Sequence, residues 1–218
     1  SCVAVMDLNG DGIEDAFVGE RAVWNDYGAA PQHVVYTGNS EGGLEVASPE
    51  EFPWMAQLGM VTDAAVADLN HDNIPELIIT TDWGPVFQIT FGDQVQVEEI
   101  ASAGLWRSVH VSDLNNDGKQ DLLLGGLGQN HGIAVGAEMP IELWVKDLDG
   151  NGDRDFLYSY VNQGTRYPLF GRDELIKESV QFRKSYLKNR AYSGQPFERM
   201  LKDWLDDASR LSVGFSGS

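Results

Sequence analysis

Four short segments of the chain carry oxygen-bearing side chains at the same spacing. In each segment, positions 1, 3, 5 and 9 hold Asp, Asn or Glu, and the segments are 7–15, 68–76, 113–121 and 147–155. A Ca²⁺ ion takes about six to eight oxygen ligands from carboxylates, amides, backbone carbonyls and water. A tight loop whose alternate residues point inward offers such oxygens, so the spacing predicts four calcium loops.

Each predicted loop would use side-chain oxygens at positions 1, 3, 5 and 9 and a backbone carbonyl at position 7. The expected ligands are Asp7, Asn9, Asp11, Ile13, Asp15, Asp68, Asn70, Asp72, Ile74, Glu76, Asp113, Asn115, Asp117, Lys119, Asp121, Asp147, Asp149, Asn151, Asp153 and Asp155. Gly12 and Gly118 occupy position 6, where a sharp turn favours a positive φ. Up to four structural Ca²⁺ ions are expected. Mg²⁺ fits less well because it keeps its waters and strict octahedral geometry.

The loops also admit a simpler interpretation, because Asp, Asn and Gly are ordinary turn formers. The presence of four copies with aligned oxygens favours calcium loops over ordinary turns. The second loop departs most from the pattern, since Asn73 replaces glycine and Pro75 stiffens its last turn. An EF-hand is excluded because position 12, where a chelating glutamate is required, holds Val18, Ile79, Leu124 and Tyr158.

Short apolar runs of strand type flank every predicted loop. They precede the loops at 3–6, 64–67, 108–112 and 141–146, and follow them at 16–18, 77–79, 122–124 and 156–158. Each loop is therefore expected to be the turn of a β-hairpin. Two hairpins with glycine turns, 34–46 and 86–100, alternate with the metal hairpins. This order predicts three four-stranded units, with the third and fourth metal loops in the last unit.

Radial repetition of four-stranded antiparallel sheets is the architecture of a β-propeller. The expected fold class is mainly β, a partial propeller of about three four-stranded blades with a C-terminal α-helical segment. The expected domains are 1–164 for the blades and 165–218 for a helical insertion or tail packed on them. Because propellers usually close with at least about four blades, further blades of the same or another chain are expected.

The charge changes at the expected boundary. The chain has 15 Lys and Arg against 34 Asp and Glu, a net charge of −19, and residues 1–164 hold five of the basic and 27 of the acidic residues. Residues 165–210 hold the other ten basic and seven acidic residues. A helix is expected to begin near Asp173, where negative charge suits a helix N-terminus, and a second near Pro196, which precedes an amphipathic pattern.

Composition excludes several classes of protein. Nucleic acid is not an expected partner, because phosphate contacts need Lys and Arg. Cys2 is the single cysteine, so the chain has no internal disulfide. No apolar run approaches the ~20 residues that span a bilayer, and no signal-peptide pattern occurs. A mature protein or a fragment of a longer one is expected.

Five segments in a fixed order carry a family resemblance. They are Asp-Leu-Asn-Asn-Asp-Gly at 113–118, Gly-Leu-Gly-Gln-Asn at 126–130, Asp-Leu-Asp-Gly-Asn-Gly at 147–152, Tyr-Pro-Leu at 167–169 and Arg-Asp-Glu-Leu at 172–175. The loops resemble FG-GAP/VCBS-repeat β-propellers, and the ordered set resembles bacterial UnbV/ASPIC-type proteins, related to cartilage acidic protein. The similarity covers nearly the whole chain, and is strongest over about 104–192. It implies a secreted or surface-exposed, calcium-loaded propeller with helices inserted after a blade.

The leading hypothesis is a non-enzymatic, calcium-binding scaffold, extracellular, on the cell surface or periplasmic, that binds a protein or carbohydrate ligand in adhesion or recognition. No catalytic or organic-cofactor-binding residue is assigned. The four histidines lie on different hairpins without metal-ligand spacing; they are His33, His71, His110 and His131. A structural piece of a larger surface assembly is a further alternative, which predicts an apolar strip along an open blade edge.

An enzyme is the second alternative, as a polysaccharide lyase or hydrolase built on a calcium-stabilised propeller. It would need a cleft that holds either a pair of carboxylates or a His/Tyr/Arg set, for which His131 or Tyr27 with Arg107 are the candidates. Aromatic side chains could stack on sugars, although packing between blades is the simpler role for Trp24, Tyr27, Trp54, Trp83 and Trp106.

Overall fold

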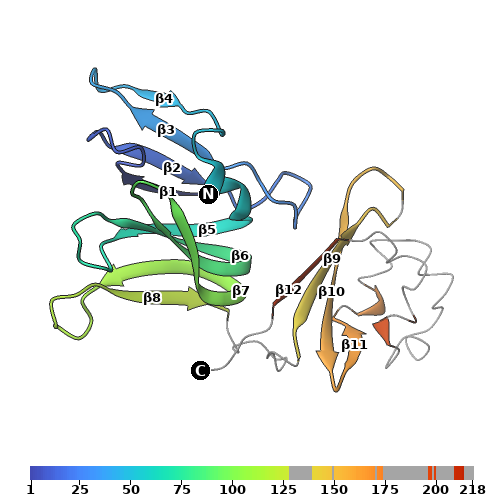
Figure 1. Ribbon diagram of the computed structural model, residues 1–218. Helices are drawn as coiled ribbons and strands as arrows, with labels where there is room; N and C mark the ends of the chain where they lie inside the picture. The colour runs from blue at the N-terminus through green and yellow to red at the C-terminus, as the bar shows by residue number, and fades with distance from the viewer. Residues whose placement is uncertain are drawn as a thin grey trace. The chain divides into compact units, whose positions relative to one another are not determined.

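The computed structural model describes residues 1–127, 139–148, 150–169, 171–173, 196, 197 and 199, and the backbone of 209–213 with the side chain of Arg210. Every strand in these residues belongs to one of three four-stranded sheets whose neighbouring strands are all antiparallel (Figure 1). The chain divides into two compact units. Unit 1 comprises Ser1–Ala22 and Ala30–Asn130, and unit 2 comprises Val23–Ala29 and His131–Ser218.

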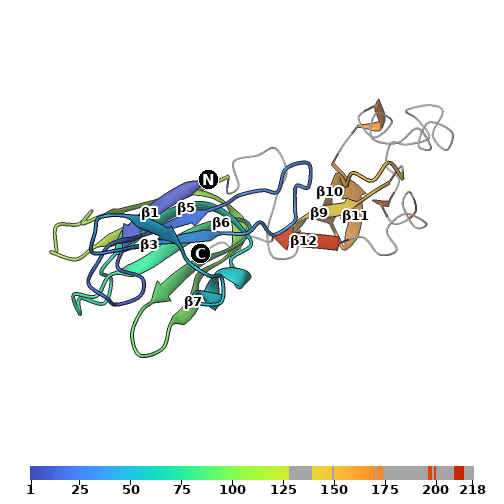
Figure 2. The same ribbon diagram turned by 90° about the horizontal axis from the view of Figure 1, so that it is seen from above.

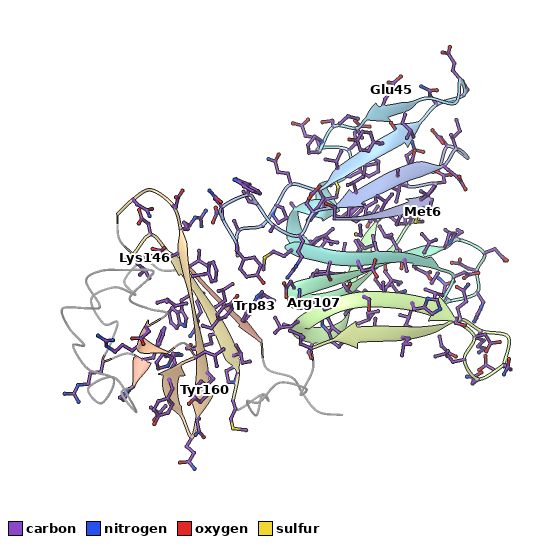
Figure 3. The ribbon with its side chains drawn as sticks, turned by 180° about the vertical axis from the view of Figure 1, so that it is seen from behind. Met6, Glu45, Trp83, Arg107, Lys146 and Tyr160 are labelled. Carbon is purple, nitrogen blue, oxygen red and sulfur yellow. The ribbon has the colours of Figure 1, made fainter. Side chains whose placement is uncertain are left out.

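The first sheet lies in unit 1 and has the order β1-β2-β3-β4. Its strands are β1 (Cys2–Met6), β2 (Asp15–Gly19), β3 (Val34–Gly38) and β4 (Leu44–Val46). The residues of β2 alternate between buried and half-buried, as expected for a strand with one face on a core. The edge strand β4 is exposed throughout, and Glu45 on it points away from the sheet (Figure 3).

The second sheet, also in unit 1, has the order β5-β6-β7-β8. Its strands are β5 (Met60–Ala67), β6 (Glu76–Thr90), β7 (Gln96–Ser112) and β8 (Asp121–Gly126). The register of β6 against β7 shifts between Asp82 and Phe87, where the two long strands bend. Figure 2 views this unit from above and shows strands of both sheets running alongside one another.

The third sheet lies in unit 2 and has the order β11-β10-β9-β12. Its strands are β9 (Ile141–Lys146), β10 (Asp155–Asn162), β11 (Thr165–Pro168) and β12 (Ser209–Val213). The turn between β10 and β11 is Gln163 and Gly164, which both have positive φ, as a type I′ hairpin turn requires. Lys146 and Tyr160 mark opposite ends of the β9–β10 hairpin (Figure 3).

The expectation of a mainly β chain with three four-stranded antiparallel sheets is confirmed, but their composition differs from the expected one. The third metal loop joins β7 to β8 in the second sheet, and does not share a sheet with the fourth loop. The reason is that β7 is continuous over 17 residues, so the last strand of the glycine hairpin is also the first strand of the third metal hairpin.

The expected C-terminal helical segment, 165–218, is not supported. The two-residue turn at Gln163 and Gly164 folds 165–168 back as β11, and the backbone of 209–213 forms β12 beside β9. The helices expected from Asp173 and Pro196 lie for the most part outside the described residues. Within the described part of the chain, no helix has the length and apolar character needed to cross a membrane.

One apolar core joins the two sheets of unit 1. It gathers side chains from β1, β2, β3, β5, β6 and the 3₁₀ helix η1 (Pro53–Gln57), and its larger buried members are Met6, Leu8, Phe17, Phe52, Trp54, Met55, Leu58, Leu77, Ile79, Phe87 and Ile89. Phe17 is fully buried and packs 5.6 Å from Trp54 between ring centroids. Burial of one such side chain contributes about 1.5–3 kcal/mol, so this core holds the hairpins of the first and second loops in place.

His33 is a buried polar residue beside this core. Its ring lies 6.0 Å from that of Phe17, and its Nδ1 accepts the backbone N–H of Glu20 at 3.1 Å. Burial lowers the pKa of His33 below its ordinary value of 6.5, against the opposing effects of a backbone hydrogen bond at Gly59 and the charge of Glu20. The folded state therefore disfavours the imidazolium.

The lowered pKa predicts a stability loss in mild acid. Above about pH 6.5 the histidine is neutral in both states, and as the pH falls below that value the unfolded state binds the proton more readily, so the free energy of unfolding falls by at most about 1.4 kcal/mol per pH unit. Urea unfolding of His33→Gln between about pH 7.5 and 5 should show a flatter dependence. The exposed His110→Gln is the matched control, and equal flattening in both variants would contradict the assignment.

Candidate metal-binding loops

All four predicted loops are closed by the same strand register. The residue that precedes each loop pairs with position 9, and the pairs are Met6 with Asp15, Ala67 with Glu76, Ser112 with Asp121, and Lys146 with Asp155. Each loop is therefore the turn of a β-hairpin, with eight residues between the paired ends. Figure 1 shows the three loops of unit 1 on one side of that unit, at the left of the view.

A second shared feature is the bond that crosses each loop. The carboxylate at position 9 accepts the backbone N–H of position 2, at 2.9 Å in Asp15–Leu8, 2.8 Å in Glu76–Leu69, 2.9 Å in Asp121–Leu114 and 2.8 Å in Asp155–Leu148. The side chains of Asp15 and Glu76 are fully buried. Asp15 also accepts the N–H of Gly38 on β3 at 2.8 Å, which ties the first loop to the next strand.

The aspartates at position 1 accept N–H groups from the far side of their own loop. The N–H of position 6 donates to this aspartate in all four loops, at 2.8 Å in Gly12–Asp7, 3.1 Å in Asn73–Asp68, 2.8 Å in Gly118–Asp113 and 2.9 Å in Gly152–Asp147. Position 5 accepts the N–H of position 7 in the same way, through Asp11, Asp72, Asp117 and Asn151. Position 3 accepts the N–H of position 5 through Asn9, Asn70 and Asn115, whereas Asp149 lies outside the described residues.

The backbone follows the same path in every copy. Position 4 has a positive φ in Gly10, His71, Asn116 and Gly150, and position 6 has a positive φ in Gly12, Asn73, Gly118 and Gly152. The expected turn at position 6 is therefore present even where glycine is replaced, because Asn tolerates this region better than most residues. Position 4 is a second such turn that the sequence pattern did not single out.

The second loop carries a buried oxygen that lacks a donor. Among the described residues no group donates a hydrogen bond to Asp68 Oδ1, although this atom is buried. In the same loop Asn70 donates its amide N–H to Glu76 Oε1 at 2.7 Å and to Asp72 Oδ2 at 3.0 Å. A bare buried carboxylate oxygen is costly, and a cation is the partner that would offset the cost.

The loops differ from a preformed carboxylate cage. The described part of the chain contains no group of three or more His, Cys, Asp or Glu side chains that could hold a metal ion. The acidic side chains instead accept N–H groups of their own loop. A carboxylate has about four lone-pair sites, so those that accept one to three hydrogen bonds retain acceptor capacity. This all-oxygen set of carboxylates, amides and backbone carbonyls fits the chemistry of Ca²⁺.

One cluster of ionic groups in unit 1 was not expected from the sequence. The buried Asp82 on β6 accepts hydrogen bonds at Oδ2 from Arg21 Nη2 and from Arg107 Nη1, both at 2.8 Å. Trp83, next in the chain, is buried at φ 63°, and Figure 3 shows it near Arg107 at the end of the second sheet. An aspartate inside an apolar strand was the available signal, but its partners lie 61 and 25 residues away.

A comparable cluster lies on the third sheet. The buried Glu142 on β9 binds Arg166 through both carboxylate oxygens, and Arg210 at 3.3 Å. Both guanidinium groups lie over the Trp144 ring, at 5.2 and 5.5 Å from its centroid. Ser159 accepts the Trp144 Nε1–H and donates to Glu142. These contacts give both arginines a structural role in unit 2.

The residues considered for an enzyme have other surroundings. Arg107 binds Asp82 in unit 1, whereas Tyr27 packs edge-on against Phe156 in unit 2, and His131 lies outside the described residues. Of the aromatic residues considered for sugar stacking, Trp54 and Trp83 are buried and Trp24 is 90% exposed.

The positive φ of His71 generates a prediction about stability. A residue with a Cβ at positive φ costs about 1–2 kcal/mol relative to ordinary backbone, and glycine removes this cost while losing more chain entropy. His71→Gly should therefore raise the free energy of unfolding by up to about 1 kcal/mol, measured by urea unfolding. His110→Gly on β7 is the matched control and should lower stability. A loss in His71→Gly would contradict the strained turn.

Comparisons of the chain with protein families, with curated proteins and with solved structures found no match. The repeated hydrogen-bond pattern of the loops is therefore the principal guide to function. It is a property of four separate segments from two units, which makes it stronger than any single turn.

Proposed function

We propose that this chain is a calcium-stabilised binding module of the β-propeller type, from a protein that works outside the cell, on its surface or in the periplasm. The observation that carries the proposal is the congruence of the four loops in register, in hydrogen bonding and in positive φ at two positions. The three four-stranded antiparallel sheets support the propeller type and the resemblance to FG-GAP/VCBS and UnbV/ASPIC-type proteins.

The proposed ligands of each ion are the side-chain oxygens of positions 1, 3, 5 and 9 with the backbone carbonyl of position 7. The buried Asp68 Oδ1 supports this assignment for the second loop, since among the described loop carboxylates it is the buried oxygen that accepts no hydrogen bond. The bound ion supplies positive charge to a cluster of carboxylates and holds the two strands of a hairpin together. Four ions would change the net charge from −19 to −11, which relieves self-repulsion.

The proposed location follows from affinity. Calcium sites of extracellular modules bind with Kd on the order of 10⁻⁴–10⁻³ M, and we expect these short loops to bind in that range. Extracellular fluids supply calcium at such concentrations, whereas a calcium-poor cytosol would leave these loops empty. A module stabilised in this way presents a rigid surface, which suits the binding or adhesion of a protein or carbohydrate ligand.

Calcium should raise the melting temperature of the protein and EDTA should lower it. Each site contributes about 2.7 kcal/mol when free calcium exceeds its Kd 100-fold. Scanning calorimetry with calcium, magnesium and EDTA measures the effect, and isothermal titration calorimetry counts the sites. An identical melt in excess EDTA and in about 10 mM calcium would overturn the proposal.

Asp117→Asn tests metal binding while keeping the hydrogen bond that forms the turn. An asparagine at this position keeps the oxygen that accepts the Lys119 N–H at 2.8 Å, but loses the negative charge. We expect the melting temperature in EDTA to change little, and the calcium-induced rise to shrink as one site weakens about tenfold or more. Asp93→Asn, in the exposed β6–β7 turn, is the matched control and should keep the full rise.

A further inference from the structure

A groove of about 790 Å³ opens on the loop-bearing side of unit 1. Four segments line it, namely Met6 with 7–10 of the first loop, 51–52 before η1, 73–75 in the second loop, and Phe91, Gly92 and Val95 around the β6–β7 turn. The lining side chains of Met6, Leu8 and Phe52 are buried, whereas those of Ile74 and Val95 are 50% and 44% exposed. The groove therefore has an apolar interior that is large enough for one or two side chains of a partner.

The charge around this groove has a single sign. Asp7 and Glu51 are among the lining residues, and no lysine or arginine is. Residues 22–106, which supply three of the four lining segments, contain no lysine or arginine at all. Unit 1 as a whole has three basic and 20 acidic residues, a net charge of −17.

The three basic residues of unit 1 lie away from the groove lining. Arg21 and Arg107 bind Asp82, and Lys119 belongs to the third loop. Calcium in the three loops of unit 1 would change its charge from −17 to −11, so the groove would remain in a negative field. Such a field attracts cationic partners and repels anionic ones.

We propose that the groove binds a cationic polypeptide segment in which an apolar side chain is flanked by lysine or arginine. This inference rests on the proposed binding function and names its partner class. The apolar residue would fill the groove, while the flanking cations face Asp7, Glu51 and the neighbouring acidic residues. Loops 1 and 2 form two of the walls, so calcium would fix the shape of the site.

The lining favours a polypeptide over a carbohydrate. Its aromatic members are Phe52, which is buried, and Phe91, which packs edge-on against Trp54 at 6.0 Å. Phe91 is half-buried and already packs on the Trp54 ring, and the lining contains no tyrosine or tryptophan. Neutral sugars would also make no use of the charge.

The test uses the full chain and a fluorescein-labelled octapeptide that alternates leucine with lysine. Fluorescence anisotropy in about 2 mM calcium should show saturable binding that weakens about tenfold or more when sodium chloride rises from about 50 to about 500 mM. A peptide with glutamate in place of lysine, and one with serine in place of leucine, should each bind at least about tenfold more weakly.

Two valine variants distinguish binding in the groove from nonspecific electrostatic attraction of the peptide to unit 1. Val95→Lys places a cation in the groove and should weaken binding of the leucine–lysine peptide about tenfold or more. Val46→Lys, on the exposed edge strand β4, makes the same change of charge elsewhere and should stay within about twofold of the unchanged protein. Melting curves of both variants check that each is folded.

The outcomes decide between the groove and the calcium proposal. A calcium-dependent melt without peptide binding overturns the groove inference and leaves the calcium proposal standing. Peptide binding with a calcium-independent melt overturns the calcium proposal and leaves the groove inference standing. Equal losses in Val95→Lys and Val46→Lys, or equal binding of the glutamate peptide, overturn the groove site. Binding of cellohexaose in place of the peptide, lost in Val95→Lys, would also overturn it in favour of a neutral glycan.

Discussion

A carboxylate at the end of a turn that accepts the N–H of the turn's second residue is the interaction on which this protein depends. It occurs in all four loops, and it joins the first residue of the second strand to the second residue of the turn. Without it, the buried carboxylates of Asp15 and Glu76 would each lose a hydrogen-bond donor, which is costly for a buried charge. In the first loop the same carboxylate reaches a third strand through Gly38.

The chain handles its excess negative charge in two ways. Most of the loop carboxylates accept backbone N–H groups, whose dipoles partly replace water without introducing a cation. Asp82 and Glu142, which are buried in strands, instead receive two arginines each. A buried carboxylate that lost one of its arginines would face a large desolvation cost. Each cluster therefore stabilises the sheet in which it lies.

Local features of the fold were predictable because they repeat. Oxygen spacing and flanking apolar runs located the four loops and their hairpins, since a turn and its strands are encoded within about 15 residues. The continuity of β7 was not predictable, because a glycine-containing stretch between two apolar runs reads equally well as a break. Asp82 and its arginines were missed for a different reason, namely that ion pairs between distant segments leave no periodic signal.

The candidate site also combines features that local sequence predicted with features that it did not. The side chains of the loops were assigned from spacing alone, whereas the groove between the first and second loops depends on how two sheets pack through Phe52 and Phe91. The strand β12 also lay beyond local pattern, since it pairs with β9 across more than 60 residues of chain. Sequence periodicity therefore describes the elements, and packing decides what they enclose.

The long stretch without lysine or arginine has a consequence for the solution around the molecule. A surface of one sign gathers an atmosphere of mobile counterions that thins over a Debye length, about 8 Å at physiological ionic strength. Divalent ions are enriched in such an atmosphere more strongly than monovalent ions, because the Boltzmann factor depends on their valence. The acidic residues of neighbouring turns thus raise the local concentration of divalent cations around each turn of unit 1. A lower concentration of background salt raises this local concentration further.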